Sequence, residues 1–183
     1  STADISDESK DLIFNYADES VRGSSVPIYR QVNNALREGV GLDKQVGFRG
    51  MTIEEFVNRL DEALQNEPLA LYKGVTYRGV RHRSRARYEA FTENFRDTTH
   101  WTNKGFLSTS ADSYQAQGFI EGLDYSTEIK IQSRTGRSID GLTPISEQEV
   151  LFSPGRRFEI VSFSEEIDLE EGFAKATIVL REL

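Results

Sequence analysis

The stretch SEQEVLF, residues 146–152, places two acidic residues one position apart, directly ahead of an apolar run. The β-branched and aromatic side chains of that run predict a strand, and side chains two positions apart in a strand lie on the same face. If the alternation extends back through Gln148, the carboxylates of Glu147 and Glu149 lie side by side. Neighbouring carboxylates raise one another's pKa, so we expect such a pair either at a solvated strand end or in a working site.

The length and composition of the chain limit what it can be. Its 183 residues, of which 37% are hydrophobic, predict one globular domain. The net charge of −8 argues against nucleic acid as a partner, because phosphate binding needs a basic face. No apolar run is long enough to span a membrane. The start at Ser1 is neither a signal peptide nor an initiator methionine, and it suggests the cut end of a longer product.

Cysteine and histidine usage argues against several kinds of active site. With no cysteine, the chain has no disulfide, no thiolate metal site and no cysteine nucleophile. The only histidines are His82 and His100, so a multi-histidine metal site or a serine–histidine triad has little support. We therefore expect no metal.

Helical periodicity precedes β-type periodicity along the chain. The pattern predicts early helices over residues 7–21, 27–37 and 52–65, with Ser25 as the cap of the second. It predicts later helices over 84–95 and 112–120, and strands over 74–80, 105–110, 127–132, 149–152, 157–163 and 174–181. Helices followed by short strands are typical of an α+β domain. We take residues 1–183 as a single domain with a helical part (1–70) and a β-rich core (71–183).

Three short motifs stand in order along the β-rich core: YRG at 77–79, STS at 108–110 and EQE at 147–149. Their order and strand contexts resemble the mono-ADP-ribosyltransferases of the arginine, serine–threonine–serine, glutamate-x-glutamate class, which includes bacterial toxins and effectors. The resemblance runs over residues 72–163, about half of the chain. It implies the ADP-ribosyltransferase fold, in which N-terminal helices pack on a mixed, mainly antiparallel core of two sheets.

The resemblance also implies NAD as the co-substrate and gives each motif a role. Glu149 would bind the ribose 2′-hydroxyl and face the positive charge that develops as nicotinamide leaves, and Ser108 would hold Glu149 in place. Arg78 would bind the diphosphate or the adjoining ribose. Phe119 is our candidate for stacking on the nicotinamide. The other residues expected at the NAD site are Tyr77, Gly79, Thr109 and Ser110.

Glu147 has a separate implied role. A guanidinium has a pKa above about 12 and is a poor nucleophile unless a carboxylate orients it and takes a proton. Family members that modify arginine carry glutamate at this position. The resemblance thus predicts ADP-ribose transfer to arginine of a target protein, with NAD glycohydrolase side activity. It implies a monomeric toxin or virulence effector that is secreted or delivered into a host cell. Pro144 departs from relatives that carry a target-contacting aromatic there, so the target is not predicted.

Two other functions remain open from the sequence. A glycoside hydrolase could use the paired glutamates, although its two carboxylates flank a sugar rather than face one side of it. The chain could also be an NAD-binding interaction module without transferase activity. The five arginines within residues 78–87 are either a solvated surface or an electropositive rim that steers an anionic ligand.

Overall fold

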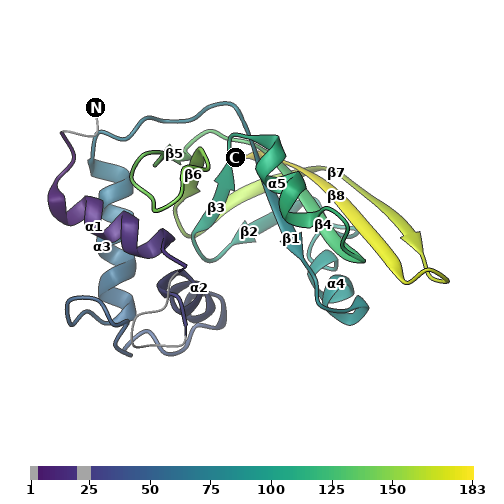
Figure 1. The fold of residues 1–183 in the computed structure, drawn as a ribbon, viewed down its shortest axis with the longest axis horizontal. Coiled ribbons are helices and arrows are strands. Elements are labelled where there is room, and N and C mark those ends of the chain that lie inside the picture. The colour runs from purple at the N-terminus through teal and green to yellow at the C-terminus, as the bar shows by residue number, and fades with distance from the viewer. Residues whose placement is uncertain (1–3, 20–25) are drawn as a thin grey trace.

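The computed structural model describes residues 4–19 and 26–183 and contains helices and one mixed sheet (Figure 1). The helices are α1 (Asp7–Ala17), α2 (Ile28–Glu38), α3 (Ile53–Asn66), α4 (Arg85–Thr92) and α5 (Ser113–Ile120). The strands are β1 (Val75–Arg81), β2 (His100–Asn103), β3 (Leu107–Ser110), β4 (Tyr125–Gln132), β5 (Arg137–Ser138), β6 (Glu149–Phe152), β7 (Arg156–Asp168) and β8 (Phe173–Glu182).

The structure confirms the predicted order of helices and strands, with boundaries that shift by a few residues. The Thr52 hydroxyl caps α3 by accepting from the Glu55 amide at 3.1 Å, as the capping-box pattern indicates. The prediction missed β2 and β5, which are too short to show a periodic pattern, and it placed the end of β7 too early. Ser25 and the predicted helix end near Val21 lie outside the described residues.

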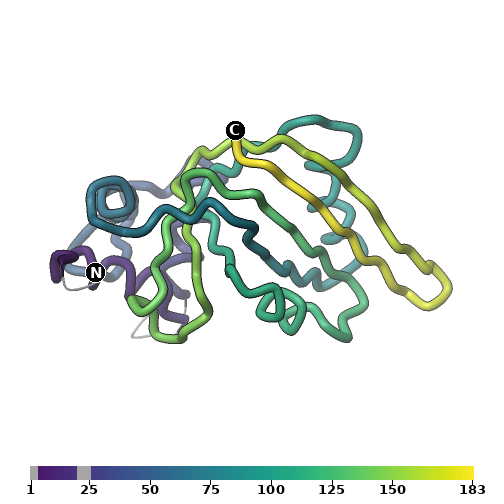
Figure 2. Tube along the Cα trace, turned by 90° about the horizontal axis from the view of Figure 1, so that it is seen from above, coloured from purple at the N-terminus to yellow at the C-terminus, as the bar shows by residue number. Residues whose placement is uncertain are grey.

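The eight strands form one sheet in the order β2-β7-β8-β4-β1-β3-β6-β5. Strands β4 and β8 run parallel, and the other neighbouring pairs of this sheet are antiparallel, so the predicted α+β class with a mixed, mainly antiparallel core is confirmed. The expected two sheets are instead joined into one, because β1 pairs with β3. Strands β1 and β3 are paired at one position only, Tyr77 opposite Ser110. This narrow junction divides the sheet into a long part, which ends in the projecting β7–β8 hairpin, and a short part made of β3, β6 and β5 (Figures 1 and 2).

Strand β6 separates two hydrophobic cores. Its Val150 and Phe152 pack with Phe158 and other residues of the long strands, whereas Leu151 points into the core formed by α1, α2 and α3. Figure 1 shows these three helices gathered beside β3, β5 and β6. Since side chains alternate along a strand, Glu149 faces the same side as Leu151, toward the N-terminal helices.

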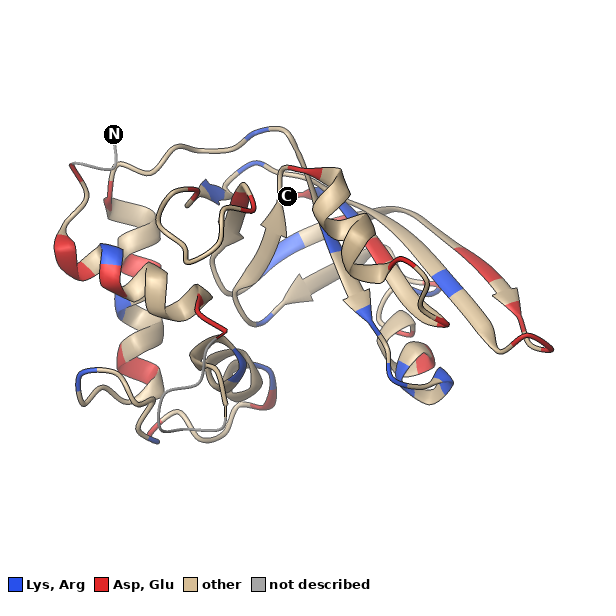
Figure 3. Ribbon diagram, viewed as in Figure 1, with Lys and Arg blue, Asp and Glu red and all other residues tan. Residues whose placement is uncertain are grey.

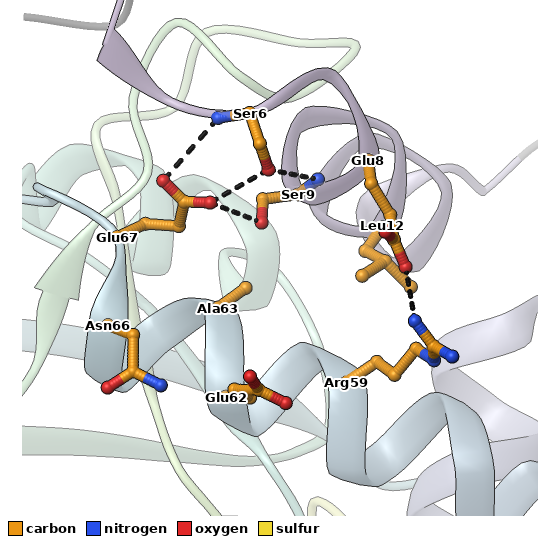
Figure 4. Close-up of a pocket in the computed structure, with 9 residues that line it drawn as sticks. All are labelled: Ser6, Glu8, Ser9, Leu12, Arg59, Glu62, Ala63, Asn66 and Glu67. Atoms are coloured by element: carbon orange, nitrogen blue, oxygen red, sulfur yellow. Dashed lines mark hydrogen bonds and ion pairs between the residues drawn. The ribbon is translucent and has the colours of Figure 1, made fainter.

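Helix α1 is fixed on α3 beside a pocket of about 200 Å³ (Figure 4). Ser6 caps α1, and the hydroxyls of Ser6 and Ser9 each donate to Glu67 at 2.8 Å. These donors lower the pKa of the Glu67 carboxyl, because they favour its charged form. The pocket is lined by residues of α1, α3 and their ends: Ser6, Glu8, Ser9, Leu12, Arg59, Glu62, Ala63, Asn66 and Glu67. It therefore belongs to the packing that positions α1.

Across residues 4–19 and 26–183, no helix combines the length and the apolar character needed to cross a bilayer.

Candidate active site

The STS and EQE motifs lie side by side because β3 and β6 are neighbours. Ser110 pairs with Glu149, and Ser108 pairs with Leu151. Residues directly opposite each other in an antiparallel pair share a face, so Ser108 and Glu149 both face the N-terminal helices. The structure thus brings together two motifs that are about 40 residues apart in the sequence.

Arg78 joins this group from the neighbouring strand β1. Its Nη1 donates to the backbone carbonyl of Ser108 at 2.9 Å, next to the single β1–β3 pairing. Burial lowers the pKa of the Arg78 guanidinium, and Arg37 on α2 lowers it further, while Tyr16 and Glu149 act in the opposite direction. The guanidinium and the Glu149 carboxylate are therefore close enough to interact electrostatically at this junction.

The predicted strand alternation through the EQE motif is wrong. Gln148 has a φ of 50°, in the left-handed region, and β6 begins only at Glu149. The Ser110 hydroxyl donates to the Glu147 carbonyl at 2.5 Å and accepts from the Asp112 amide at 3.0 Å, which holds this turn. The two glutamates consequently differ in environment, since Glu147 is exposed whereas Glu149 is partly buried.

The pKa of the Glu149 carboxyl is raised above its ordinary value. Burial is the main reason that its pKa is raised to about 7, and the nearby charge of Glu147 and that of Glu19 raise it further. A hydrogen bond with the Ser108 side chain and the charge of Arg78 oppose that rise. The Oε2 atom of Glu149 is buried and has no hydrogen-bond partner within the described residues. A buried acceptor without a partner is costly, so this oxygen is suited to receive a donor from a ligand.

The Thr109 hydroxyl, in the middle of the STS motif, joins the two strands. Thr109 is buried, and its hydroxyl donates to the Val150 carbonyl at 2.8 Å. This bond ties β3 to β6 next to Glu149. The contacts of Thr109 and Ser110 are thus with the backbone that carries the EQE motif.

Phe119 lies on α5, beneath Arg81 of β1. The Arg81 guanidinium carbon is 3.8 Å from the ring centroid, and Arg81 Nε donates to the Phe119 carbonyl at 2.6 Å. The close approach of α5 to β1 requires Gly79, because a Cβ there would lie 2.6 Å from the Ala116 carbonyl oxygen. Phe119 is 47% exposed, so one face of a partly exposed ring is covered by a cation. Its stacking on nicotinamide stays a prediction, as does a direct NAD contact of Tyr77.

The other arginines within residues 78–87 lie around the start of α4, where Figure 3 shows a group of basic residues. Arg83, Arg85 and Arg87 are all exposed. The loop ahead of Glu147 is also exposed at Pro144 and at Ile145, which is 62% exposed. Both regions are accessible to other molecules.

Sequence reasoning missed two residues of the site, both on N-terminal helices. Tyr16 of α1 is 1% exposed, and its pKa is influenced by Ser108, Glu149 and Arg78, so it lies next to the site. Asn33 of α2 donates to the Tyr16 hydroxyl at 2.9 Å. Burial is the main reason that the pKa of Tyr16 is raised to about 12. The available signal was a tyrosine and an asparagine on the apolar faces of amphipathic helices, where buried polar groups need partners.

Comparison with known proteins shows which family this chain belongs to. The family model of the ADP-ribosyltransferase exoenzymes matches residues 3–181. A curated relative from Pseudomonas putida (strain GB-1), named NAD(+)--protein-arginine ADP-ribosyltransferase Tre1, is 31% identical over 133 residues. That match covers 73% of this chain and only 23% of the relative, which is a much longer protein.

Solved structures show the same fold. The ADP-ribosyltransferase HopU1 of Pseudomonas syringae pv. Tomato DC3000 has a TM-score of 0.68 at 24% identity, covering 99% of this chain and 79% of its own. The ADP-ribosyltransferase Vis, a toxin from Vibrio splendidus that was solved in complex with agmatine, has a TM-score of 0.69 at 20% identity, covering 98% of this chain and 75% of its own. With the family model matching almost the whole sequence, this chain belongs to the ADP-ribosyltransferase exoenzyme family.

Proposed function

We propose that residues 1–183 form the single catalytic domain of an NAD-dependent mono-ADP-ribosyltransferase that modifies arginine in a target protein. The observation that carries this proposal is the junction of Arg78, Ser108 and Glu149, with the exposed Glu147 beside it. The name of Tre1 supports the reaction. The agmatine complex of Vis supports a guanidinium-bearing acceptor, because agmatine has the same functional group as arginine.

Cleavage of NAD would depend on Glu149. Nicotinamide is already a cationic leaving group, so breaking its bond to the ribose C1′ needs stabilisation of an oxocarbenium-like transition state rather than a general acid. Ionised Glu149 supplies a negative charge, and its unpartnered buried Oε2 accepts a hydrogen bond from the ribose 2′-hydroxyl. The substrate thereby removes the cost of leaving this oxygen unpaired.

Arg78 would hold the dinucleotide in place. Its Nη1 bonds the Ser108 carbonyl, and a guanidinium has four further N–H donors that can reach phosphate or ribose oxygens. Because the Arg78 guanidinium is permanently charged, its contact with the dinucleotide keeps the reacting ribose near Glu149 during cleavage.

Transfer would depend on Glu147. As the bond between C1′ and nicotinamide breaks, a new bond forms between C1′ and a guanidinium nitrogen of the target arginine, and Glu147 takes the proton that this nitrogen releases. The exposure of Glu147 agrees with contact to a second protein. When water attacks instead, free ADP-ribose results, so we also propose glycohydrolase side activity.

The Glu147→Gln substitution tests this division of roles. We expect transfer to agmatine or to a target protein to fall about a hundredfold, because the acceptor loses its base. Hydrolysis of etheno-NAD should stay within about threefold of the wild type, because Glu149 is unchanged. The matched control is Glu170→Gln, which changes an exposed glutamate of the β7–β8 hairpin. Equal loss of both activities in Glu147→Gln would contradict the assignment.

Hydrolysis of NAD should also depend on pH in a defined direction. Because the reactive form of Glu149 is the carboxylate and its pKa is about 7, kcat/KM should rise with pH through about 7 and then level off. Initial rates of etheno-NAD hydrolysis between pH 5.5 and 9 measure this. A profile that is flat across that range would show that Glu149 ionises outside it.

The first measurement is turnover of etheno-NAD by the wild-type chain. NAD binding without turnover would instead favour an interaction module, and release of sugars from glycosides would favour a glycoside hydrolase. We further propose that the protein acts as a monomeric bacterial toxin or effector that is secreted or delivered into a host cell.

A further inference from the structure

Three exposed arginines lie together at the start of α4. Arg83 is in the loop after β1, and Arg85 and Arg87 are in the first turn of the helix. Residues 78–87 hold five arginines and no acidic residue, although the whole chain has a net charge of −8. Figure 3 shows this basic group at the start of α4. We call Arg83, Arg85 and Arg87 the arginine surface.

The charge of the arginine surface is not neutralised by the chain itself. Within residues 4–19 and 26–183, the side chains of Arg83 and Arg87 form no ion pair or hydrogen bond. Arg85 Nε is 3.9 Å from Glu89 Oε1, and both side chains are about half exposed. Several other exposed arginines do have a carboxylate partner: Arg49 with Asp11, Arg59 with Glu8 and Arg181 with Glu159. The arginine surface is therefore available to an anionic partner.

The position of these cations is unfavourable for α4. The N-terminus of a helix carries a partial positive charge, so acidic residues in the first turn stabilise a helix and basic ones destabilise it. Helices α1 and α3 have acidic residues in their first turns, whereas α4 has none. Ser84 accepts from the Arg87 amide at 3.2 Å, so a glutamate at position 87 would complete a capping box. Departures from such local rules are expected at functional positions, which indicates a role for these arginines other than helix stability.

Strand β1 connects the arginine surface to the candidate active site. Tyr77 pairs with Ser110, whose hydroxyl bonds the Glu147 carbonyl. The strand ends four residues later at Arg81, about 13 Å further at roughly 3.3 Å per residue, and Arg83 follows directly. A typical protein–protein interface covers about 800 Å² of each partner, which is a patch about 30 Å across. A protein whose arginine reaches Glu147 can thus contact the arginine surface as well.

We propose that the arginine surface is a docking site for an acidic region of the target protein, separate from the position that receives the target arginine. This inference rests on the proposed function, which makes the partner a protein. Guanidinium groups bind carboxylates through two parallel hydrogen bonds. Because the rest of the chain is acidic, it repels an acidic partner everywhere else, which orients the partner before its arginine reaches Glu147. The same net charge disfavours a nucleic acid as the occupant.

Two synthetic acceptor peptides test the proposal. Each has one arginine, a flexible Gly/Ser linker of about 16 residues that spans about 20–24 Å, and a tail of either six glutamates or six glutamines. With the wild type at low ionic strength, we expect KM for the glutamate peptide to be about tenfold lower, with an equal kcat. The difference should disappear at about 0.5 M NaCl, because salt screens exposed charges.

The double variant Arg83→Glu/Arg87→Glu removes the two unpaired cations and leaves α4 able to form a capping box. It should lose the preference for the glutamate peptide, while its melting temperature stays the same or rises by about one to three degrees. Hydrolysis of etheno-NAD and transfer to agmatine should stay within about twofold of the wild type, because exposed charges away from the site contribute little. The matched control is Lys44→Glu/Arg157→Glu, which makes the same change in net charge at two other exposed cations and should keep the preference.

Fluorescence anisotropy of the same peptides with a fluorescein label measures docking without catalysis. The wild type and the control should bind the glutamate peptide more tightly than the glutamine peptide, and the double variant should not. If the wild type binds in this way but does not turn over NAD, the proposed function fails and the docking surface stands.

Three outcomes would overturn the inference. One is an equal KM and equal binding of the two peptides in the wild type. Another is tighter binding of an oligouridine of about 12 nucleotides than of the glutamate peptide, which would make the arginine surface a site for RNA. The third is a salt-dependent loss of NAD hydrolysis in the double variant, which would mean that these arginines steer NAD instead of the target protein.

Discussion

The Glu149→Gln variant is expected to lose both NAD hydrolysis and arginine transfer, each by about a thousandfold. Glutamine has nearly the same shape as glutamate but no negative charge to face the developing oxocarbenium ion, and removing one electrostatic stabiliser of a transition state typically costs about this much. The loss should be in kcat rather than in NAD affinity, since the glutamine oxygen can still accept a bond from the ribose. Single-turnover assays with etheno-NAD and binding titrations separate the two.

The same substitution should make the protein more stable at alkaline pH. The ordinary pKa of a glutamate is 4.5, whereas that of folded Glu149 is about 7. Between these values the unfolded chain is ionised while the folded chain holds its proton, so the free energy of unfolding falls as pH rises through this window. Above pH 7 the full cost is on the order of 1–3 kcal/mol, which a neutral glutamine removes.

Thermal unfolding at pH 5 and pH 8 measures this change in stability. Glu149→Gln should raise the melting temperature by several degrees at pH 8 and by much less at pH 5. The control is Glu128→Gln on β4, a buried glutamate with Lys130 Nζ 3.7 Å from its carboxylate. It should keep NAD hydrolysis and gain no stability at pH 8. A Glu149→Gln protein that is inactive and also less stable at pH 8 would mean that the carboxylate is structural.

The strand part of this site could be predicted because the residues within each motif are adjacent in the sequence, and because the STS motif ends a strand and the EQE motif leads into one. The pairing of Ser110 with Glu149 requires only that two predicted strands be neighbours. The left-handed Gln148 could not be predicted in the same way. Its conformation depends on the Ser110 hydroxyl, which bonds the carbonyl of Glu147, 37 residues further along the chain. A non-glycine residue with this φ is uncommon, so the simple alternation was the reasonable expectation.

The helical part of the site was missed for a different reason. Tyr16 lies among Leu12 and Ile13 on the buried face of α1, so its spacing predicts a core residue, which it also is. What gives it a polar partner is the packing of α1 and α2 on β3, through Asn33. Helical periodicity identifies which face is buried but carries no information on what that face meets.

Arg78→Lys is expected to lower kcat/KM for NAD by about a thousandfold, mainly through KM. Lysine keeps the positive charge but has a single ammonium group, which cannot bond the Ser108 carbonyl and two oxygens of the dinucleotide in the planar arrangement of a guanidinium. Losing two to three charge-assisted hydrogen bonds costs about 4 kcal/mol, which corresponds to about three factors of ten. Etheno-NAD kinetics together with isothermal titration of NAD give KM and the dissociation constant.

The control for charge-preserving replacement is Arg181→Lys, on β8, where an exposed arginine pairs with Glu159 at the surface. Surface pairs contribute little, so this variant should match the wild type in both stability and turnover. Arg78→Lys should also weaken the β1–β3 junction, because the Ser108 carbonyl loses its guanidinium donor where Tyr77 and Ser110 form the one paired position. Faster hydrogen exchange of the β3 amides than in Arg181→Lys would detect this. If Arg78→Lys kept both its NAD affinity and its β3 protection, Arg78 would neither bind the dinucleotide nor join the two parts of the sheet.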